Sequence, residues 1–161
     1  MWAGMLSTLL IGTDIVRGDF NRSDAFTILS NKDVIDTFSQ DALAAPVRRV
    51  RNPSIDPPND APTAQLWFKP LKEGGRGVIL FNRGETALRN WTFALSDVDL
   101  TRAATVYDCW QHSHNGTHAK SFSATEVPAH GVAACGTIPQ CGGTKVSREE
   151  AAKDPDVCFK H

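Results

Sequence analysis

The sequence has no excess of charge of either sign, with 17 Lys and Arg residues against 18 Asp and Glu residues and a net charge of -1. Proteins that bind nucleic acid need a basic face, so this balance argues against that class. There is also no apolar run near the roughly 20 residues that a membrane-spanning helix requires. We therefore expect neither nucleic acid nor a membrane as a partner.

The apolar residues 1–11, MWAGMLSTLLI, lack the flanking features of a signal peptide. No positively charged segment comes before them, and no small-residue cleavage site precedes Asp14 and Arg17. The apolar part of a signal peptide remains the alternative. We favour a buried helix end and strand, so no signal peptide is evident in these residues.

Residues 65–82, QLWFKPLKEGGRGVILFN, contain two apolar runs rich in aromatic and β-branched side chains. Between the runs lie three glycines, which take the positive φ angles of a tight reversal without steric cost. This pattern predicts a β-hairpin. Further short strands are expected at residues 90–95, 103–110, 119–123 and 131–135, with turns at 82–85, 114–116 and 128–131. Residues 65–138 are therefore expected to form a β-sandwich domain.

Residues 1–45 follow a different pattern, in which α and β signals are mixed. Residues 9–12 are a short apolar run typical of a strand buried on both faces, and Thr13-Asp14 ends it. Asn21 or Ser23 is expected to cap a first helix, and Asn31 or the following Lys32-Asp33 to start a second one. Such a strand needs neighbours on both sides, so the segment is expected to belong to a larger sheet.

Two polar segments flank the expected sandwich. Residues 46–64 form a connector that holds five of the nine prolines, which favour extended backbone. Its basic cluster Arg48, Arg49 and Arg51 is expected to be solvated or to bridge domains rather than to bind nucleic acid. Residues 139–161 form a polar tail that contains two of the four cysteines.

Four cysteines allow three disulfide pairings, which sequence alone does not distinguish. We predict Cys109–Cys135 within the sandwich and Cys141–Cys158 in the tail. Three N-x-S/T sequons are glycosylation candidates in a secreted chain, and together with the even cysteine count they favour an oxidising compartment. The three acceptor residues are Asn21, Asn90 and Asn115.

Three groups of residues are candidates for functional sites. Asp14 is a substrate-binding candidate because it follows the expected strand, although a loop-capping role is favoured. The closely spaced His112, His114 and His118 are assigned to a mobile hairpin tip rather than to a metal site. The alternation of Trp67, Trp91 and Trp110 with polar residues favours core packing over stacking on a sugar. No metal and no cofactor are expected.

Several stretches, in order, resemble melibiase-type α-galactosidases. Residues 1–15, MWAGMLSTLLIGTDI, resemble the last barrel strand of that family, and residues 25–43, AFTILSNKDVIDTFSQDAL, resemble the helices that follow it. LWFKPLKEGGRGVILFNRG, VYDCWQH and SFSATEVPAHGVAAC resemble its C-terminal sandwich. The similarity covers residues 1–138 and departs at Ser7-Thr8, at Ala42 and at Cys109.

The resemblance implies an α+β fragment plus an all-β part: the last β/α unit of a (β/α)8 barrel, then an antiparallel Greek-key β-sandwich. It implies a retaining glycoside hydrolase acting on terminal α-D-galactosides, secreted or lysosome-like in its full-length form. Retaining enzymes use two carboxylates about 5 Å apart, and the family carries both on earlier barrel strands. We therefore expect no catalytic residue here, and no hydrolysis by this chain alone.

Two alternatives remain open at this point. One is a non-catalytic carbohydrate-binding or structural β-sandwich. The other is complementation, in which an N-terminal barrel fragment binds this chain and completes the α-galactoside site. The chain could also form a homo-oligomer. Galactose is not distinguished from N-acetylgalactosamine by these residues.

Overall fold

The computed structural model describes residues 1, 3–7, 10, 12, 20–41, 43–50 and 63–139. The helices are α1 (Asp24–Leu29) and α2 (Lys32–Val34), and α2 continues as the π-helical turn η2 (Ile35–Ser39). The 3-10 turns are η1 (Phe20–Arg22), η3 (Lys72–Gly74) and η4 (Leu95–Val98). The strands are β1 (Arg48–Arg49), β2 (Ala64–Pro70), β3 (Arg76–Asn82), β4 (Leu88–Ala94), β5 (Ala104–Asp108), β6 (Ser113–His118), β7 (Ser121–Val127) and β8 (Val132–Pro139).

The predicted hairpin is confirmed as β2 and β3, which pair antiparallel from Ala64↔Asn82 to Pro70↔Arg76. The reversal passes through η3, and Gly74 takes a φ of 77° there. An L side chain rarely adopts that angle, so glycine at this position permits the turn.

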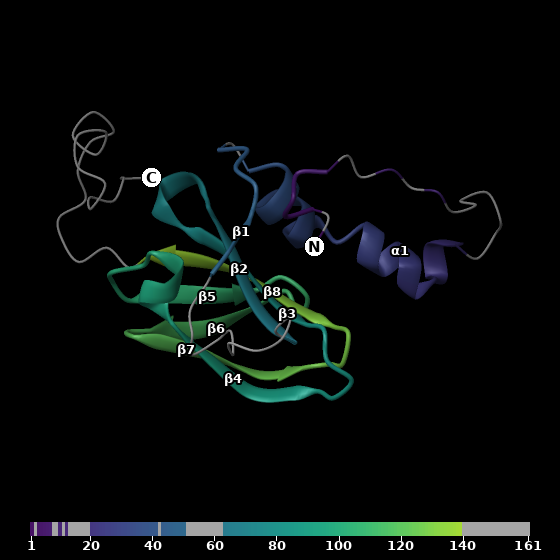
Figure 1. Cartoon of the computed structure of the whole chain (residues 1–161). Coiled ribbons are helices and arrows are strands. Elements are labelled where there is room, and N and C mark those ends of the chain that lie inside the picture. Colours follow the sequence, from purple (N-terminus) through teal and green to yellow (C-terminus); the bar gives the residue numbers. More distant parts are fainter. Residues whose placement is uncertain are drawn as a thin grey trace.

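Two antiparallel sheets form the sandwich (Figure 1). The larger sheet has the order β1-β2-β3-β8-β5-β6, and the smaller one consists of β4 and β7. Because β8 lies between β3 and β5, the last described strand holds together parts of the sheet that are distant in sequence.

The main core fills the space between the two sheets, where alternate residues of each strand point inward. Phe93 and Phe122 from the small sheet meet edge to face, with 5.9 Å between ring centroids. The buried members are Leu66, Phe68, Val78, Leu80, Phe93, Leu95, Val98, Leu100, Ala104, Val106, Phe122, Ala124, Val127 and Cys135.

A second apolar cluster lies on the opposite, outer face of the large sheet. There Phe38 of η2 and Val47 pack on Ile79, Cys109 and Ala134. Several partly buried side chains join them: Met1, Ala3, Val34, Trp67, Phe81, Tyr107, Trp110 and Val132. The N-terminal segment is therefore attached to the sandwich through this outer face.

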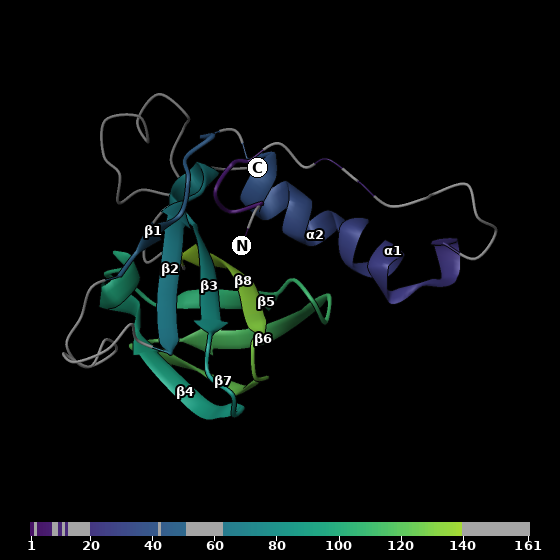
Figure 2. The same ribbon diagram turned by 45° about the vertical axis from the view of Figure 1, so that its right-hand side comes forward.

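Both expected helices are present with their predicted caps. Ser23 caps α1 by accepting a hydrogen bond from the Phe26 backbone N–H, and Asn31 caps α2 by accepting one from the Val34 N–H. Phe38 is 1% exposed, whereas α1 has no buried residue. In both views α1 extends away from the sheets (Figure 1, Figure 2).

The expected hairpin tip at residues 112–118 is wrong. Residues Ser113–His118 form strand β6, which pairs with β5, and the reversal falls at residues 109–112. Asp108 sets this reversal, because its Oδ1 accepts hydrogen bonds from the backbone N–H groups of Trp110 and Gln111. The Asn115-Gly116 pair is typical of a turn, but in the structure it lies inside β6, where Gly116 has a φ of 77°.

The predicted Cys109–Cys135 disulfide is also wrong, since both cysteines are free and buried. Cys135 pairs with Asp108 across β5 and β8, so Cys109, one residue further, points to the other face. Accordingly Cys135 lies in the main core and Cys109 in the outer cluster. Neighbouring backbones therefore carry the two sulfurs on opposite sides of one sheet.

Some predictions fall outside the described residues. They concern Asp14, most of the strand expected at 9–12, the Cys141–Cys158 pair, the tail from 140 and connector residues 51–62. Within the described part of the chain, no helix is both long and apolar enough to cross a lipid bilayer.

Candidate functional site

The outer face of the large sheet, together with the segment Asn31–Ser39 docked on it, is the candidate functional surface. We call it the junction. Phe38 is its apolar anchor, and its ring lies directly over Gly77 of β3. A Cβ at Gly77 would lie 2.9 Å from Phe38 Cε1, so the absence of a side chain there lets the ring approach the sheet.

Lys69 of β2 ties the end of η2 to the sandwich. It is fully buried, and its Nζ donates a 3.1 Å hydrogen bond to the Phe38 carbonyl. Burial lowers the pKa of this amine, and the nearby Asp41 carboxylate acts in the opposite direction. A cation also suits the C-terminal end of a helical segment, where carbonyl groups are exposed.

The start of α2 is tied to the β5–β6 reversal. Asn31 is buried, and its Nδ2 donates a 2.9 Å hydrogen bond to the Cys109 carbonyl while its Oδ1 caps the helix. One side chain thus fixes both the beginning of α2 and its position on the sheet.

Asp33, in the first turn of α2, has two partners from the sandwich. Its Oδ2 accepts a 2.6 Å hydrogen bond from the Tyr107 hydroxyl and lies 2.6 Å from Nδ1 of His112. The bond from Tyr107 and then the contact with His112 lower the pKa of Asp33. The same bond to Asp33 raises the pKa of Tyr107 to about 12.

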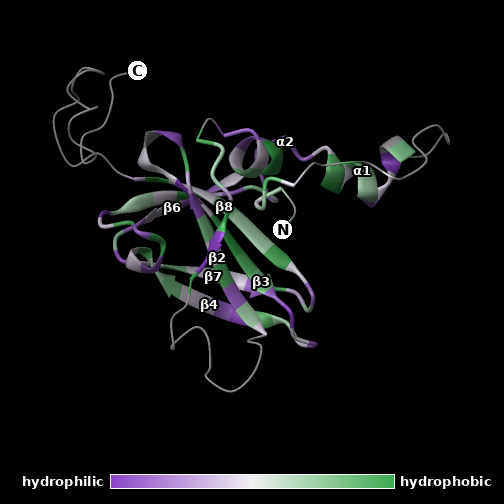
Figure 3. Ribbon diagram, turned by 45° about the horizontal axis from the view of Figure 1, so that its top comes forward, coloured by the Kyte–Doolittle hydropathy of each residue, from purple (hydrophilic) through white to green (hydrophobic). Residues whose placement is uncertain are grey.

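Next to the junction lies an apolar surface that nothing in the described structure covers. In α1 the exposed fractions are 39% for Phe26, 56% for Ile28 and 44% for Leu29. Figure 3 shows hydrophobic residues, in green, on this protruding helix. Apolar residues gathered in this way mark an interaction surface.

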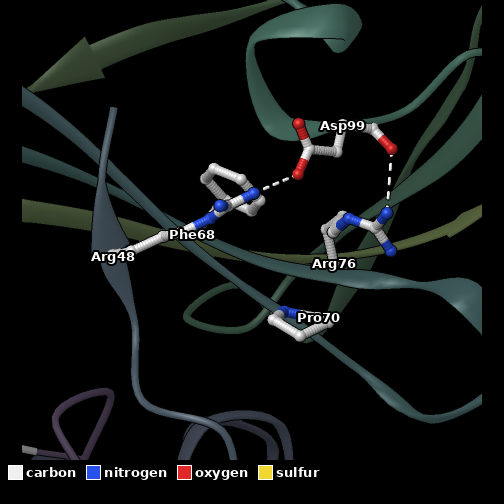
Figure 4. A pocket seen from close by; sticks show the side chains of 5 residues that line it. All are labelled: Arg48, Phe68, Pro70, Arg76 and Asp99. Atoms are coloured by element: carbon white, nitrogen blue, oxygen red, sulfur yellow. Dashed lines mark hydrogen bonds and ion pairs between the residues drawn. The ribbon is translucent and has the colours of Figure 1, made fainter. Parts of the chain in front are cut away.

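A cavity of about 370 Å³ lies at the edge of the large sheet and is lined by Arg48, Phe68, Pro70, Arg76 and Asp99 (Figure 4). Arg48 pairs with the Asp99 carboxylate, and its guanidinium lies 4.5 Å from the centroid of the Phe68 ring. Arg76 donates to the carbonyls of Gly74, Gly75, Val98 and Asp99 at 2.8–2.9 Å. Both guanidiniums are thus used to hold η3, η4 and β1 together.

A second cavity, of about 320 Å³, lies beside η2 and is lined by two carboxylates, Asp36 and Asp41. Asp36 pairs with Lys32. Asp41 accepts hydrogen bonds from the backbone N–H groups of Leu43 and Lys72. Each carboxylate therefore has a structural partner.

The three histidines do not converge. His112 contacts Asp33, the His114 ring packs against Tyr107, and His118 Nε2 lies 2.7 Å from the Asn115 carbonyl. In the described residues, no group of three or more His, Cys, Asp or Glu side chains is arranged to hold a metal ion. Each of the three tryptophans is partly buried against an apolar cluster, Trp91 at the main core and Trp67 and Trp110 at the outer one.

Residues 61–135 match the alpha galactosidase C-terminal beta sandwich domain family. Alpha-galactosidase 2 of Arabidopsis thaliana is 32% identical over 130 residues, which are 80% of this chain and 30% of that protein. The chain belongs to the melibiase-type α-galactosidase family, of which it spans the C-terminal portion.

Two further matches delimit this assignment. The crystal structure of alpha-galactosidase I from Mortierella vinacea superposes with a TM-score of 0.71 and 25% identity, covering 89% of this chain and 34% of that one. An isomalto-dextranase of Arthrobacter globiformis is 29% identical over 73% of this chain and 18% of its own length. The melibiase-type chain thus spans about a third or less of these relatives.

Sequence reasoning missed Lys69 and the Asp33–Tyr107–His112 contact of the melibiase-type junction. Lys69 carries one signal, since it is the only charged residue within the apolar strand pattern 65–70. The contact of Asp33 with Tyr107 and His112 joins residues 74 and 79 positions apart, and no local pattern marks it.

Proposed function

We propose that this chain is the C-terminal part of an α-galactosidase-like glycoside hydrolase, acting on terminal α-D-galactosides, and that its sandwich braces the catalytic barrel. The observation that carries the proposal is the superposition on the Mortierella vinacea enzyme. It extends over 89% of the chain, beyond the sandwich into the N-terminal segment. A match to the sandwich alone would indicate only a reused module.

In this proposal residues 1–45 supply the last β/α unit of a (β/α)8 barrel, and the sandwich has Greek-key topology. The position of β8 between β3 and β5 supports that topology. The exposed Phe26, Ile28 and Leu29 support the barrel assignment, because helices around such a barrel bury one apolar face against their neighbours.

The chemistry would come from carboxylates on other barrel strands. A retaining glycosidase needs one carboxyl group as nucleophile and one as acid, about 5 Å apart in a substrate cleft. Asp36 and Asp41, the two carboxylates that line one cavity, are instead engaged by Lys32 and by backbone N–H groups. We assign no catalytic residue to the described part of the chain and keep Asp14 as a substrate-binding candidate.

The partners and location follow from the same assignment. The substrate would bind only together with the rest of the barrel, without a cofactor, and the N-terminal barrel portion would be the principal protein partner. We propose a secreted or lysosome-like location. Asn90 and Asn115 have exposed side chains that a glycan would reach, and Asn21 is the third candidate.

The test uses an aryl α-D-galactoside with a chromogenic leaving group. The purified chain is expected to give no turnover. A chimera in which it replaces the corresponding third of Arabidopsis thaliana alpha-galactosidase 2 is expected to be active. The matched chimera with Phe26→Asp and Ile28→Asp should lose activity, since two charges would enter the barrel contact. Turnover by the chain alone, lost in an Asp36→Asn, Asp41→Asn variant, would contradict the proposal.

A second candidate is a carbohydrate-binding or purely structural sandwich. It is favoured by the similarity to an isomalto-dextranase, because a protein named for a different activity shares most of this region. Titration of the chain with galactosides and isomaltosides by calorimetry, with Trp67→Ala and Trp110→Ala variants, separates the two. Binding that either substitution abolishes would favour the second candidate.

A further inference from the structure

The contact of Asp33 with Tyr107 and His112 has a feature that the proposed brace does not require. It places the ionisable imidazole of the β5–β6 reversal against a carboxylate of α2, so the contact joins two different elements of the fold. The imidazole is the side chain that changes charge between about pH 5 and 8 in its ordinary state. We propose that Asp33, Tyr107 and His112 form a proton-responsive clamp, which holds α2 on the sandwich more tightly when the His112 ring is protonated.

The geometry gives each partner a defined role. Tyr107 and His112 approach the same oxygen, Asp33 Oδ2, at 2.6 Å each. The Tyr107 hydroxyl donates at every relevant pH and keeps the carboxylate in place. A protonated imidazole always donates from Nδ1 and carries a positive charge, whereas a neutral ring donates there in only one of its tautomers. Proton uptake therefore adds an ion pair to a contact already aligned.

The backbone directs His112 toward this contact. His112 has a φ of 51°, a left-handed conformation that non-glycine residues seldom adopt. The two hydrogen bonds to Asp108 Oδ1 hold the preceding residues Trp110 and Gln111 in the reversal. The ring thus projects from a constrained turn rather than from a free loop.

The charged groups around the clamp leave Asp33 as the anion that faces His112. From α2 and η2, Lys32 is paired with Asp36. From β5, Asp108 is occupied by backbone N–H groups of the reversal. From β6, the His114 ring packs against the Tyr107 ring, with 5.0 Å between the ring centroids. Burial raises the pKa of the nearby Cys109 thiol to about 11, which keeps it neutral.

Solvent reaches the clamp, as proton exchange requires. The side chains of His112 and Asp33 are 56% and 30% exposed. Exposed ion pairs change local equilibria by modest factors, so we expect about a two- to fivefold change in the opening equilibrium of α2. Because Asn31, Lys69 and Phe38 also hold the segment, the clamp adjusts the docking and is not its sole attachment.

The chain offers a matched control for this test. His130 Nε2 lies 3.0 Å from Glu85 Oε2, a second pair of imidazole and carboxylate, and it joins two sandwich turns without touching α2. His112→Gln and His130→Gln therefore each remove one imidazole–carboxylate contact, the first at α2 and the second within the sandwich. Asp33→Asn, alone and with His112→Gln, completes a double-mutant cycle.

The experiment measures hydrogen exchange of the amides of Asn31–Ser39 in the full chain at pH 5.5 and pH 8.0, corrected for intrinsic exchange rates. We expect the Asp33–His112 coupling to be about two- to fivefold larger at pH 5.5, and His130→Gln to leave this segment unchanged. Equal coupling at both pH values, or an equal effect of His130→Gln, would overturn the clamp. If a variant fails to fold, ¹⁵N spectra of the unmodified chain decide. Amide signals of Asn31–Ser39 that shift together with the His112 ring signals between pH 5.5 and pH 8.0 support the clamp, and amide signals that stay unchanged while the ring signals shift overturn it.

Discussion

Replacing Asn82 by aspartate tests how two turns at one end of the sandwich are held together. Asn82 is fully buried at the end of β3. Its Nδ2 donates to the carbonyls of Thr86, Val127 and Pro128 at 2.8–3.2 Å, and its Oδ1 accepts from the Gly84 N–H at 2.9 Å. An amide nitrogen has two hydrogens, so two donors serve three carbonyls here. A single side chain therefore joins the β3–β4 turn to the β7–β8 turn.

Asn82→Asp keeps the shape but replaces the donor by a second oxygen that faces three carbonyls. Two hydrogen bonds are lost, each contributing about 1 kcal/mol net. A buried, unpaired carboxylate adds a further penalty, so we expect the free energy of unfolding to fall by about 3–5 kcal/mol at pH 7. The loss should shrink as the pH is lowered. The surrounding carbonyls favour the protonated acid, so the native state takes up a proton before the unfolded chain does.

Urea denaturation followed by tryptophan fluorescence measures this at pH 7.5 and pH 4.5. Asn90→Asp is the control, because Asn90 is an exposed asparagine in the neighbouring strand β4 and should change stability by less than about 0.5 kcal/mol. A cost below about 1 kcal/mol for Asn82→Asp, or a larger cost at pH 4.5 than at pH 7.5, would refute the assigned role of the donor.

Three further predictions concern the junction and the thiols. Phe38→Ala should lower the free energy of unfolding by about 3–5 kcal/mol and release α2 to hydrogen exchange; an unchanged exchange pattern would remove Phe38 as the anchor. The contribution of Asp33 to stability should be present above the ordinary carboxyl pKa and fade as the pH falls, because the Tyr107 hydrogen bond lowers the pKa of Asp33 in the native state. When the free energy of unfolding is measured against pH, the Asp33→Asn variant should lack this decline. Parallel curves for the variant and the unmodified chain would contradict the prediction. Cys109 and Cys135 should react with iodoacetamide only after unfolding, since burial raises the pKa of both thiols. Rapid alkylation of either thiol in the folded chain, detected by mass spectrometry, would contradict this prediction.

The parts of the fold that follow a local period were predictable. The hairpin of β2 and β3 is encoded by two alternating runs and the glycines between them, and the caps Ser23 and Asn31 by short polar side chains ahead of apolar residues. β6 was not predictable in this way. Its Asn115-Gly116 pair is the strongest local turn signal, but pairing with β5 overrides it.

The junction was hidden for a different reason. Its polar contacts join residues more than 30 positions apart, such as Lys69 with the Phe38 carbonyl and Asn31 with the Cys109 carbonyl. The disulfide error has a similar origin. Cysteine spacing carries no information about which face of a strand each sulfur occupies, and one step along β5 moves the side chain to the other face.

The two helices differ in what stabilises them, and this difference supports the division of the chain. Helices shorter than about 12 residues are marginal alone, so both need tertiary contacts. α2 and η2 obtain them from the sandwich through Phe38, Asn31 and Lys69. α1 has its Ser23 cap and an edge-to-face contact between Phe20 and Phe26, but buries no side chain. Helical structure before Asn31 therefore depends on contacts that the described residues do not supply, and the barrel that we propose would provide them.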